Sequence, residues 1–188
     1  MGAGKTTVAR LFRRAGWPVF DADAEVHRLQ GRGGAAVPAI ARLWPETVRD
    51  GAVDRAALRA RVIGHAHAMR ALEAIIHPRV KAARERFLRR CRRRGVRWCV
   101  LDIPLLFEIG AQALCDVVLV VTAPEPLRVQ RVMGRRSLTH AQAVALIRRQ
   151  MPDAERLRRA DVVIRTGLSR ARTYAQISRL RERLEAMA

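Results

Sequence analysis

Cysteine, aromatic residues and long apolar runs are scarce in this chain of 188 residues, and each scarcity excludes a class of protein. Its three cysteines, Cys91, Cys99 and Cys115, are too few and too scattered for a disulfide framework or a metal cage, which favours a reducing cytoplasm. Aromatic residues make up 4% of the chain, which leaves little for base stacking on nucleic acid. The longest apolar run, residues 117–123, is far shorter than the roughly 20 residues of a membrane-spanning helix. The composition therefore predicts a cytoplasmic protein that makes no contact with a membrane.

Lysine is also scarce, although the chain is strongly basic. There are 37 Lys+Arg against 17 Asp+Glu, a formal net charge of +20, and only Lys5 and Lys81 are lysines, which leaves 35 arginines. A charge of this size is typical of proteins with polyanionic partners. The alternative, arginine in place of lysine over a solvated surface, requires no partner, and the motifs have to decide between the two.

Apolar residues make up 49% of the chain, enough for the core of one folded domain. Residues 96–103 and 116–122 are dense in Val, Ile and Leu without alternation, which is typical of parallel strands covered on both faces. Shorter strands are predicted at 17–20 and 161–164. Helices are predicted at 5–14, 24–29, 38–43, 55–63, 66–76, 78–94, 127–133, 139–150 and 170–187. This order predicts a three-layer α/β fold with a parallel central sheet and a helical insertion.

The chain begins with Gly2-Ala3-Gly4-Lys5-Thr6-Thr7, which matches the second half of a phosphate-binding loop, G-x-x-x-x-G-K-[S/T]. Glycines let backbone N–H groups surround phosphate oxygens, Lys5 would reach the β- and γ-phosphates, and the Thr6 hydroxyl would bind Mg²⁺. The following helix adds the positive end of its dipole. We therefore expect these six residues to hold the phosphates of ATP; the alternative is a flexible glycine-rich terminus.

The first glycine of the full pattern would lie before Met1, and so would the buried strand that normally leads into such a loop. We expect the natural protein to begin about ten residues earlier, with the first strand missing from this chain. Without that strand its neighbours have open edges, and nucleotide affinity should be weak.

Carboxylates follow two of the predicted strands. Asp21 and Asp23 come at the end of the first strand, the end at which open α/β sheets bind ligands. One of them can face a ligand while the other caps the next helix, or both can serve only as caps and turn formers. Asp102, which follows the apolar run at 96–101, would hold Mg²⁺ through a water molecule or simply end the strand.

The motifs together resemble a known family over essentially the whole chain. They are Gly2–Thr7, Asp21-Ala-Asp23 with His27, Asp50-Gly-x-Val-Asp-Arg55, His77-Pro78, Leu101-Asp-Ile-Pro-Leu-Leu-Phe-Glu108, Arg149-Gln-Met-Pro152 and Ala160-Asp-Val-Val-Ile164. The sequence resembles the dephospho-CoA kinases, P-loop kinases related to the nucleoside monophosphate kinases. The resemblance implies transfer of the γ-phosphoryl group of ATP to the 3′-hydroxyl of dephospho-CoA, which forms CoA, with ATP and Mg²⁺ required.

The resemblance also implies roles for individual residues. Asp23 would be the general base for the ribose hydroxyl, while Lys5, Arg131 and Arg135 would act on the transferring phosphoryl group. Residues predicted to bind substrate are His77, Asp102, Phe107 and Arg149; His77 would bind or orient the acceptor, and Arg149 is a third candidate for the lid cation. The alternatives are a solvated helix face for each arginine, a helix cap for His77 and a core position for Phe107.

The family pattern divides the chain into three parts. Residues 1–30, 95–130 and 155–188 would form the nucleotide-binding core, residues 31–94 the acceptor-binding region, and residues 131–154 a lid that closes over the reacting groups. Arg165-Thr166-Gly167 departs from the Asx-Gly turn usual in the family, which affects the expected adenine contacts.

Two other functions are compatible with parts of the sequence. One is a P-loop kinase for another nucleoside or nucleotide, against which the Asp23/His27 and Phe107-Glu108 elements argue. The other is a basic nucleic-acid-binding protein with a vestigial loop, against which the few aromatic residues argue. Because ATP and dephospho-CoA are polyanions, a few of the arginines would suffice to attract them. We expect a monomer or small homo-oligomer.

Overall fold

The computed structural model describes residues 1–136, 138–148 and 150–187. The chain forms two compact units: the first combines Met1–Val19 with the chain from Trp98 onward, and the second is Phe20–Arg97. Strand β1 (Val19–Asp21) spans the division. No helix in the described part of the chain is long and apolar enough to cross a membrane.

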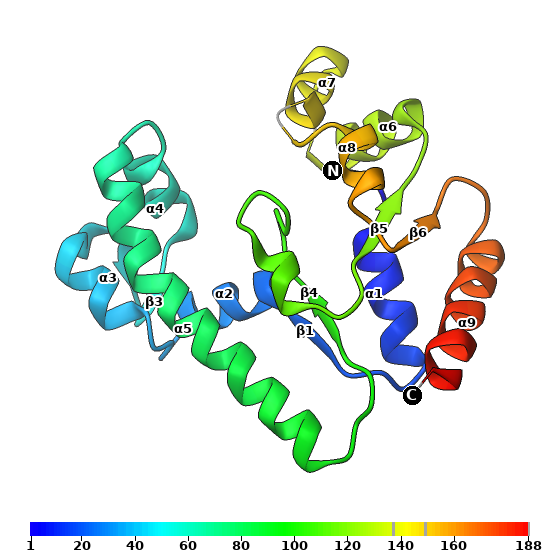
Figure 1. Cartoon of the computed structure of the whole chain (residues 1–188). Helices are drawn as coiled ribbons and strands as arrows, with labels where there is room; N and C mark the ends of the chain where they lie inside the picture. Colours follow the sequence, from blue (N-terminus) through cyan, green and yellow to red (C-terminus); the bar gives the residue numbers. More distant parts are fainter. Residues whose placement is uncertain (137, 149, 188) are drawn as a thin grey trace. The chain divides into compact units, whose positions relative to one another are not determined.

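The first unit contains the predicted parallel strands (Figure 1). Strands β5 (Leu119–Thr122) and β6 (Val162–Arg165) pair in parallel over their whole length. Within the described residues, β4 (Val100–Asp102) is hydrogen-bonded to neither of them. Instead the Val100 N–H donates to Pro18 O at 2.8 Å. The α/β class is therefore confirmed, with the sheet in separate two-stranded pieces.

Helices α1 (Lys5–Arg14) and α9 (Arg170–Ala186) pack together in the core of this unit (Figure 1). Their apolar residues recur at helical spacing, so that one face of each helix is buried. The buried members of this core are Val8, Phe12, Ile164, Ile177, Leu180 and Leu184. Beyond α1, the Trp17 ring stacks on Phe12 and on Trp98, with ring centroids 5.3 and 6.1 Å apart.

A group of short helices follows β5: α6 (Glu125–Arg136), α7 (His140–Arg148) and α8 (Asp153–Arg158). Helices α6 and α7 pack through Val129, Val132, Ala143 and Ile147. The sequence predicted α6 and α7 but missed α8, because six residues are too few to show helical periodicity. It also missed a 3₁₀ turn, η2 (Ala111–Leu114), in the segment before β5.

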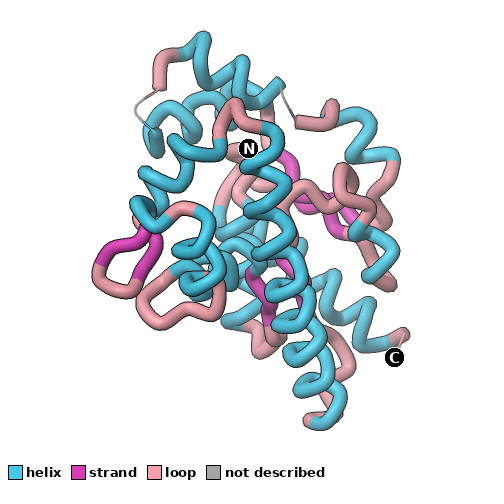
Figure 2. The backbone as a smooth tube through the Cα atoms, turned by 90° about the vertical axis from the view of Figure 1, so that its left-hand side faces the viewer, coloured by secondary structure: helices cyan, strands magenta, loops and turns pink. Residues whose placement is uncertain are grey.

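The second unit is mostly helical (Figure 2). It contains α2 (Ala22–Gln30), α3 (Val37–Leu43), η1 (Pro45–Thr47), α4 (Arg55–Val62) and α5 (Ala66–Arg93), and its core includes Leu29, Ile40, Val53, Leu58 and Ile76. Strands β2 (Val48–Arg49) and β3 (Ala52–Val53) form an antiparallel hairpin. The sequence analysis missed this hairpin, although Asp50 and Gly51, both with positive φ, are a strong hairpin turn signal.

The predicted helix boundary at His77-Pro78 is wrong, because α5 is one helix of 28 residues with Pro78 in its interior. Proline in a helix interior costs about 3 kcal/mol, so other interactions must hold the two halves together. The Arg79 guanidinium donates to Ile75 O at 2.6 Å and to Ala35 O at 3.0 Å. Buried residues on both sides of the proline, Ile76 and Phe87 among them, anchor the helix within its own unit. Tertiary packing therefore outweighs the local signal.

The structural boundaries differ from the expected parts. The second unit begins at Phe20, so it includes α2, which the prediction assigned to the nucleotide-binding core. The expected lid, residues 131–154, begins within α6 and ends at the start of α8. Its function as a moving lid stays a prediction.

Candidate active site

The glycines of the phosphate loop lie against two other segments of the first unit. Gly2 and Gly4 have φ angles of +72° and +91°, and Gly4 caps the N-terminus of α1. A Cβ added to Gly2 would lie 2.6 Å from Arg128 O, and one added to Gly4 would lie 3.0 Å from Thr166 Oγ1. The close approach and the left-handed backbone together explain why glycine stands at both positions.

Lys5 and Asp102 meet beside this loop. Lys5 Nζ lies 2.6 Å from Asp102 Oδ1, and the side chains are 47% and 9% exposed, respectively. This is a charge contact without hydrogen-bond geometry, and Asp102 Oδ1 has no hydrogen-bond partner within the described residues. The strand-end aspartate thus lies at the phosphate loop, as its place in the sequence suggested.

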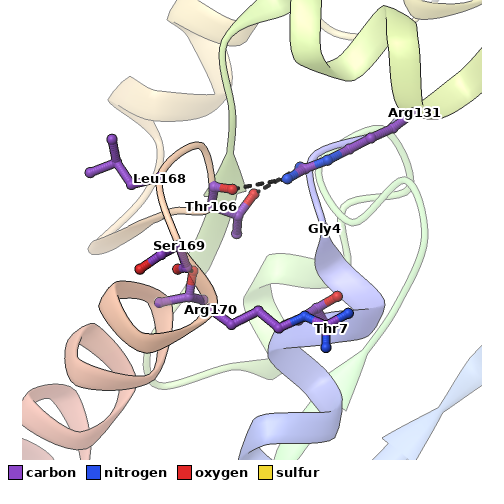
Figure 3. A pocket seen from close by; sticks show the side chains of 8 residues that line it. Gly4, Thr7, Arg131, Thr166, Leu168, Ser169 and Arg170 are labelled. Carbon is purple, nitrogen blue, oxygen red and sulfur yellow. Dashed lines mark hydrogen bonds between the residues drawn. The ribbon is translucent and has the colours of Figure 1, made fainter.

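Arg131 of α6 also reaches the loop, and it does so together with Thr166 (Figure 3). The guanidinium donates through Nη1 to Gly2 O (3.1 Å) and Thr166 Oγ1 (3.2 Å), and through Nη2 to Thr166 O (3.0 Å). Thr166, only 8% exposed, donates its hydroxyl to Ala3 O at 2.6 Å. Arg131 was predicted for this site and Thr166 was not, although Thr166 immediately follows a strand, where α/β sheets place functional groups.

Arg128, one turn before Arg131, was also missed by the sequence analysis. It is 3% exposed, donates from Nε to Met1 O at 3.0 Å, and forms an ion pair with Asp153 of α8. Arg156 forms a second ion pair with Asp153. Burial raises the pKa of Asp153, but hydrogen bonds and charge from Arg156 and Arg128 outweigh it and hold the pKa below its ordinary value. Arg128 therefore links α6 to α8, whereas Arg156 and Asp153 pair within α8.

A cavity of about 300 Å³ opens next to the phosphate loop (Figure 3). Its lining combines hydroxyls, two arginines and one leucine; the residues are Gly4, Thr7, Arg131, Thr166, Leu168, Ser169, Arg170 and Thr173. Leu168 is 71% exposed, and the Arg170 side chain extends towards α1 in Figure 3. The two arginines could bind an anionic group of a ligand, and Leu168 could contact an apolar ring of the same ligand.

The two carboxylates of the Asp21-Ala-Asp23 element have separate positions in the second unit. Asp21 Oδ1 accepts a hydrogen bond from Ala24 N at 2.9 Å and thereby caps α2. Asp23 is exposed in the first turn of the same helix. Of the two arrangements left open by the sequence, the structure has one carboxylate as a cap and the other turned to solvent. The role of Asp23 as a base stays a prediction.

The remaining predicted residues lie elsewhere. His77 is exposed in the middle of α5, so its expected position at a helix start is wrong, and so is the cap that was its alternative. The Phe107 ring is 9% exposed and packs with Val118 and Val120, which does not favour a contact with substrate. The side chain of Arg135, on α6, and the whole of Arg149 lie outside the described residues.

Leu105 lies in the same motif as Phe107, residues 101–108, but its side chain is exposed. It is 51% exposed and has a φ of +53°, a left-handed conformation that is strained for a side chain branched at Cγ. Strained residues of this kind cluster at ligand sites. Leu105 follows Asp102 by three residues. Its exposed side chain could therefore make an apolar contact with a ligand, whereas that of Phe107 is buried.

A glycine loop that opens a helix, with its lysine against the carboxylate at the end of a strand, defines the class of this protein. The fold and these residues are those of a P-loop kinase. The family model for dephospho-CoA kinase, CoaE, matches residues 1–170. The chain belongs to the dephospho-CoA kinase family.

Individual relatives agree with this assignment. The chain is 54% identical over 190 residues to the dephospho-CoA kinase of Gluconobacter oxydans, covering 98% of this chain and 94% of the relative. It is 48% identical to that of Mesorhizobium japonicum, with 96% and 93% covered.

Solved structures share the fold. The crystal structure of TT1252 from Thermus thermophilus superimposes with a TM-score of 0.79 at 37% identity, covering 97% of this chain and 93% of that one. The dephospho-CoA kinase from Campylobacter jejuni gives a TM-score of 0.67 at 20% identity, covering 98% and 93%. The latter likeness concerns the fold alone.

Proposed function

We propose that this chain transfers the γ-phosphoryl group of ATP to the 3′-hydroxyl of dephospho-CoA and so forms CoA. The observation that carries the proposal is the contact between Lys5 and the buried Asp102 at the phosphate loop. It brings a half-exposed cation and a nearly buried anion to one point, where a nucleotide and its metal ion require both. The relatives named dephospho-CoA kinase support the choice of acceptor.

The phosphates of ATP would bind at the start of α1. Backbone N–H groups of the loop and the positive end of the helix attract the phosphate oxygens. Lys5, which is half-exposed, turns from Asp102 to the β- and γ-phosphates when they arrive. The neighbouring cavity takes the nucleoside part of the donor, with Leu168 as an apolar contact for the base.

Two oxygen groups at the loop fit a magnesium ion. Mg²⁺ prefers oxygen ligands and keeps several waters, so one hydroxyl, one water-linked carboxylate and the phosphates suffice. Asp102 Oδ1 is buried without a hydrogen-bond partner in the described structure, and the Thr6 side chain is exposed in the first turn of α1. Groups of three or more metal-ligating side chains are absent from the described residues, which agrees with a site completed by the substrate. The ion, when bound, neutralises charge on the phosphates.

The acceptor requires a base for its hydroxyl proton. Asp23 serves this purpose because its carboxylate is exposed, whereas that of Asp21 is engaged as the helix cap. Phosphoryl transfer depends mainly on positioning and charge neutralisation, so an ionised carboxylate within hydrogen-bond reach is sufficient. We further propose that the second unit binds dephospho-CoA, with His77 among its contacts.

Charge and composition bear on how the substrates are attracted and where the protein is located. Both substrates are polyanions, and a net charge of +20 draws them in without a nucleic-acid partner. Arg131, Arg135 and Arg149 would neutralise charge near the transferring group, and closure of residues 131–154 would exclude water. The small number of cysteines supports a cytoplasmic location.

The test is a substrate panel. The 188-residue chain and a form extended upstream in the same reading frame are each incubated with ATP, Mg²⁺ and either dephospho-CoA, a nucleoside or a nucleoside monophosphate. We expect dephospho-CoA to be phosphorylated in preference. Preference for another acceptor would support the alternative kinase, and inactivity of both forms would remove the assignment.

A further inference from the structure

Thr166 occupies a position where three segments of the first unit meet. It follows β6, and its N–H donates to Thr122 O of β5 at 2.9 Å. Its hydroxyl hydrogen is directed to Ala3 O at 2.6 Å, while the hydroxyl oxygen accepts from Arg131 Nη1 at 3.2 Å. A threonine hydroxyl has one hydrogen to donate, so the bond to Ala3 requires the arginine to be the donor in the other.

Arg131 completes the arrangement from the side of α6. It donates to Gly2 O at 3.1 Å and to Thr166 O at 3.0 Å. One hydrogen bond of Arg131 holds the Gly2 carbonyl and the hydroxyl bond of Thr166 holds the Ala3 carbonyl, two successive carbonyls of the phosphate loop. The other two bonds of Arg131 tie it to Thr166. Figure 3 shows the arginine reaching from α6 to Thr166 past Gly4.

Holding these carbonyls fixes the direction of the donors beside them. In a planar trans peptide the C=O and the following N–H point in opposite directions. A carbonyl of Gly2 directed to Arg131 turns the Ala3 N–H away from it, and a carbonyl of Ala3 directed to Thr166 does the same for the Gly4 N–H. Glycine at positions 2 and 4 would otherwise let these peptide planes rotate at little cost.

We propose that Thr166, acting through Arg131 and the loop carbonyls, is a positioning residue that orients the Ala3 and Gly4 N–H groups for the donor phosphates. This rests on the proposed function, because it concerns the same phosphate loop. Thr166 itself need not touch the nucleotide phosphates. Its hydroxyl matters because it turns a flexible glycine loop into a preorganised anion site before ATP arrives.

The test compares Thr166→Val with the matched control Thr166→Ser, in whichever form of the chain is the more active. Valine keeps the shape and removes the hydroxyl, whereas serine keeps the hydroxyl and removes the methyl group. We expect Thr166→Val to lower kcat/KM for ATP about tenfold, the size expected for loss of a buried hydrogen bond, with KM for dephospho-CoA unchanged. Thr166→Ser should remain within about twofold of the wild type.

A binding measurement keeps this inference separate from the proposed reaction. Titration with a non-hydrolysable ATP analogue should show about tenfold weaker binding for Thr166→Val, and the Ala3 and Gly4 amide resonances should respond less to the analogue. If the wild type binds the analogue but makes no CoA, the proposed function fails while the titration still decides the role of Thr166. Wild-type binding by Thr166→Val, or equal losses in the valine and serine variants, would overturn the inference.

A second variant covers the case in which Thr166→Val does not fold. Arg131→Lys keeps the charge but cannot hold Gly2 O and Thr166 O at once. We expect it to weaken analogue binding in the same way. Where Thr166→Val does fold, the double variant should be no worse than the more impaired single one, since both act on the same loop. Additive losses would contradict a shared role.

Discussion

At the scale of single residues, Gly2 of the phosphate loop is constrained by the close approach of another backbone segment. Gly2 and Gly16 both have positive φ, but a Cβ at Gly2 would meet the backbone of Arg128, while nothing lies within 4 Å of one at Gly16. Backbone atoms cannot move aside as a flexible side chain can. A side chain at Gly16 would therefore meet conformational strain alone, whereas one at Gly2 would also meet a steric conflict.

We predict that Gly2→Ala abolishes detectable binding of an ATP analogue, whereas Gly16→Ala does not. Gly16→Ala should cost only the strain of a left-handed alanine, about 1 kcal/mol of unfolding free energy. Calorimetric titration and thermal unfolding of both variants provide the measurement. Wild-type binding by Gly2→Ala would show that the loop does not approach Arg128 as described.

The pairing of Lys5 with Asp102 predicts linked effects on turnover. Asp102→Asn should lower kcat by at least about a hundredfold, because the carboxylate for the metal-bound water is lost. Lys5→Ala should lower kcat more than it raises KM for ATP, since charge develops in the transition state. The exposed Asp116, in the loop before β5, provides the control: steady-state kinetics of Asp116→Asn should match the wild type. Comparable losses in all three variants would contradict a specific role for the pair.

At the scale of elements, the two carboxylates at the start of α2 have different surroundings. The Asp21 side chain caps α2, and Asp23 lies exposed two residues later. A cap contributes to stability, whereas a general base contributes to the chemical step. Substitutions at the two positions should therefore be distinguished by stability and kinetics together.

Asp21→Ala should lower the unfolding free energy by about 1 kcal/mol, the usual value of an N-cap. Asp23→Asn should leave stability unchanged and lower kcat by about a hundredfold or more, with ATP binding intact. Urea unfolding and single-turnover kinetics measure the two effects. An unaffected chemical step in Asp23→Asn would remove this residue as the base.

The link between α6 and α8 predicts a dependence of stability on pH. Asp153 has a lowered pKa in the folded protein, so it stabilises the fold above its ordinary pKa of 3.8 and loses this contribution as the pH falls through the lower folded value. Asp153→Asn should therefore reduce stability at pH 7 and flatten its decline below about pH 4. Thermal unfolding at a series of pH values tests this. Parallel profiles for variant and wild type would contradict it.

At the scale of the whole molecule, motifs with local physical meaning were predictable and long-range contacts were not. The glycine loop, the strand-end Asp102 and most helices follow from patterns within a few residues. Thr166 and Arg128 act through partners more than 100 residues away in sequence, and nothing in their neighbourhood indicates those partners. Pro78 shows the reverse case, in which a strong local signal for a helix end is overruled by packing and by Arg79.

The arginines that give the chain its positive charge fall into two groups, those with defined contacts and those on solvated helix faces. A few arginines, such as Arg128 and Arg131, have defined contacts at the loop. Most others lie on exposed helix faces, for example Arg89 and Arg90 of α5 or Arg179 of α9, where a solvated surface explains them. The net charge therefore supports attraction of anionic substrates in general and does not identify them.

The most direct test of the account follows both products of the reaction at once. The purified chain is incubated with ATP, Mg²⁺ and dephospho-CoA, and ³¹P NMR follows the new phosphate ester while ADP is quantified. We predict one 3′-phosphorylated CoA for each ADP formed, and the same one-to-one ratio at a much lower rate in the Lys5→Ala variant. ADP without CoA, or a phosphate on any position other than the 3′-hydroxyl, would contradict it.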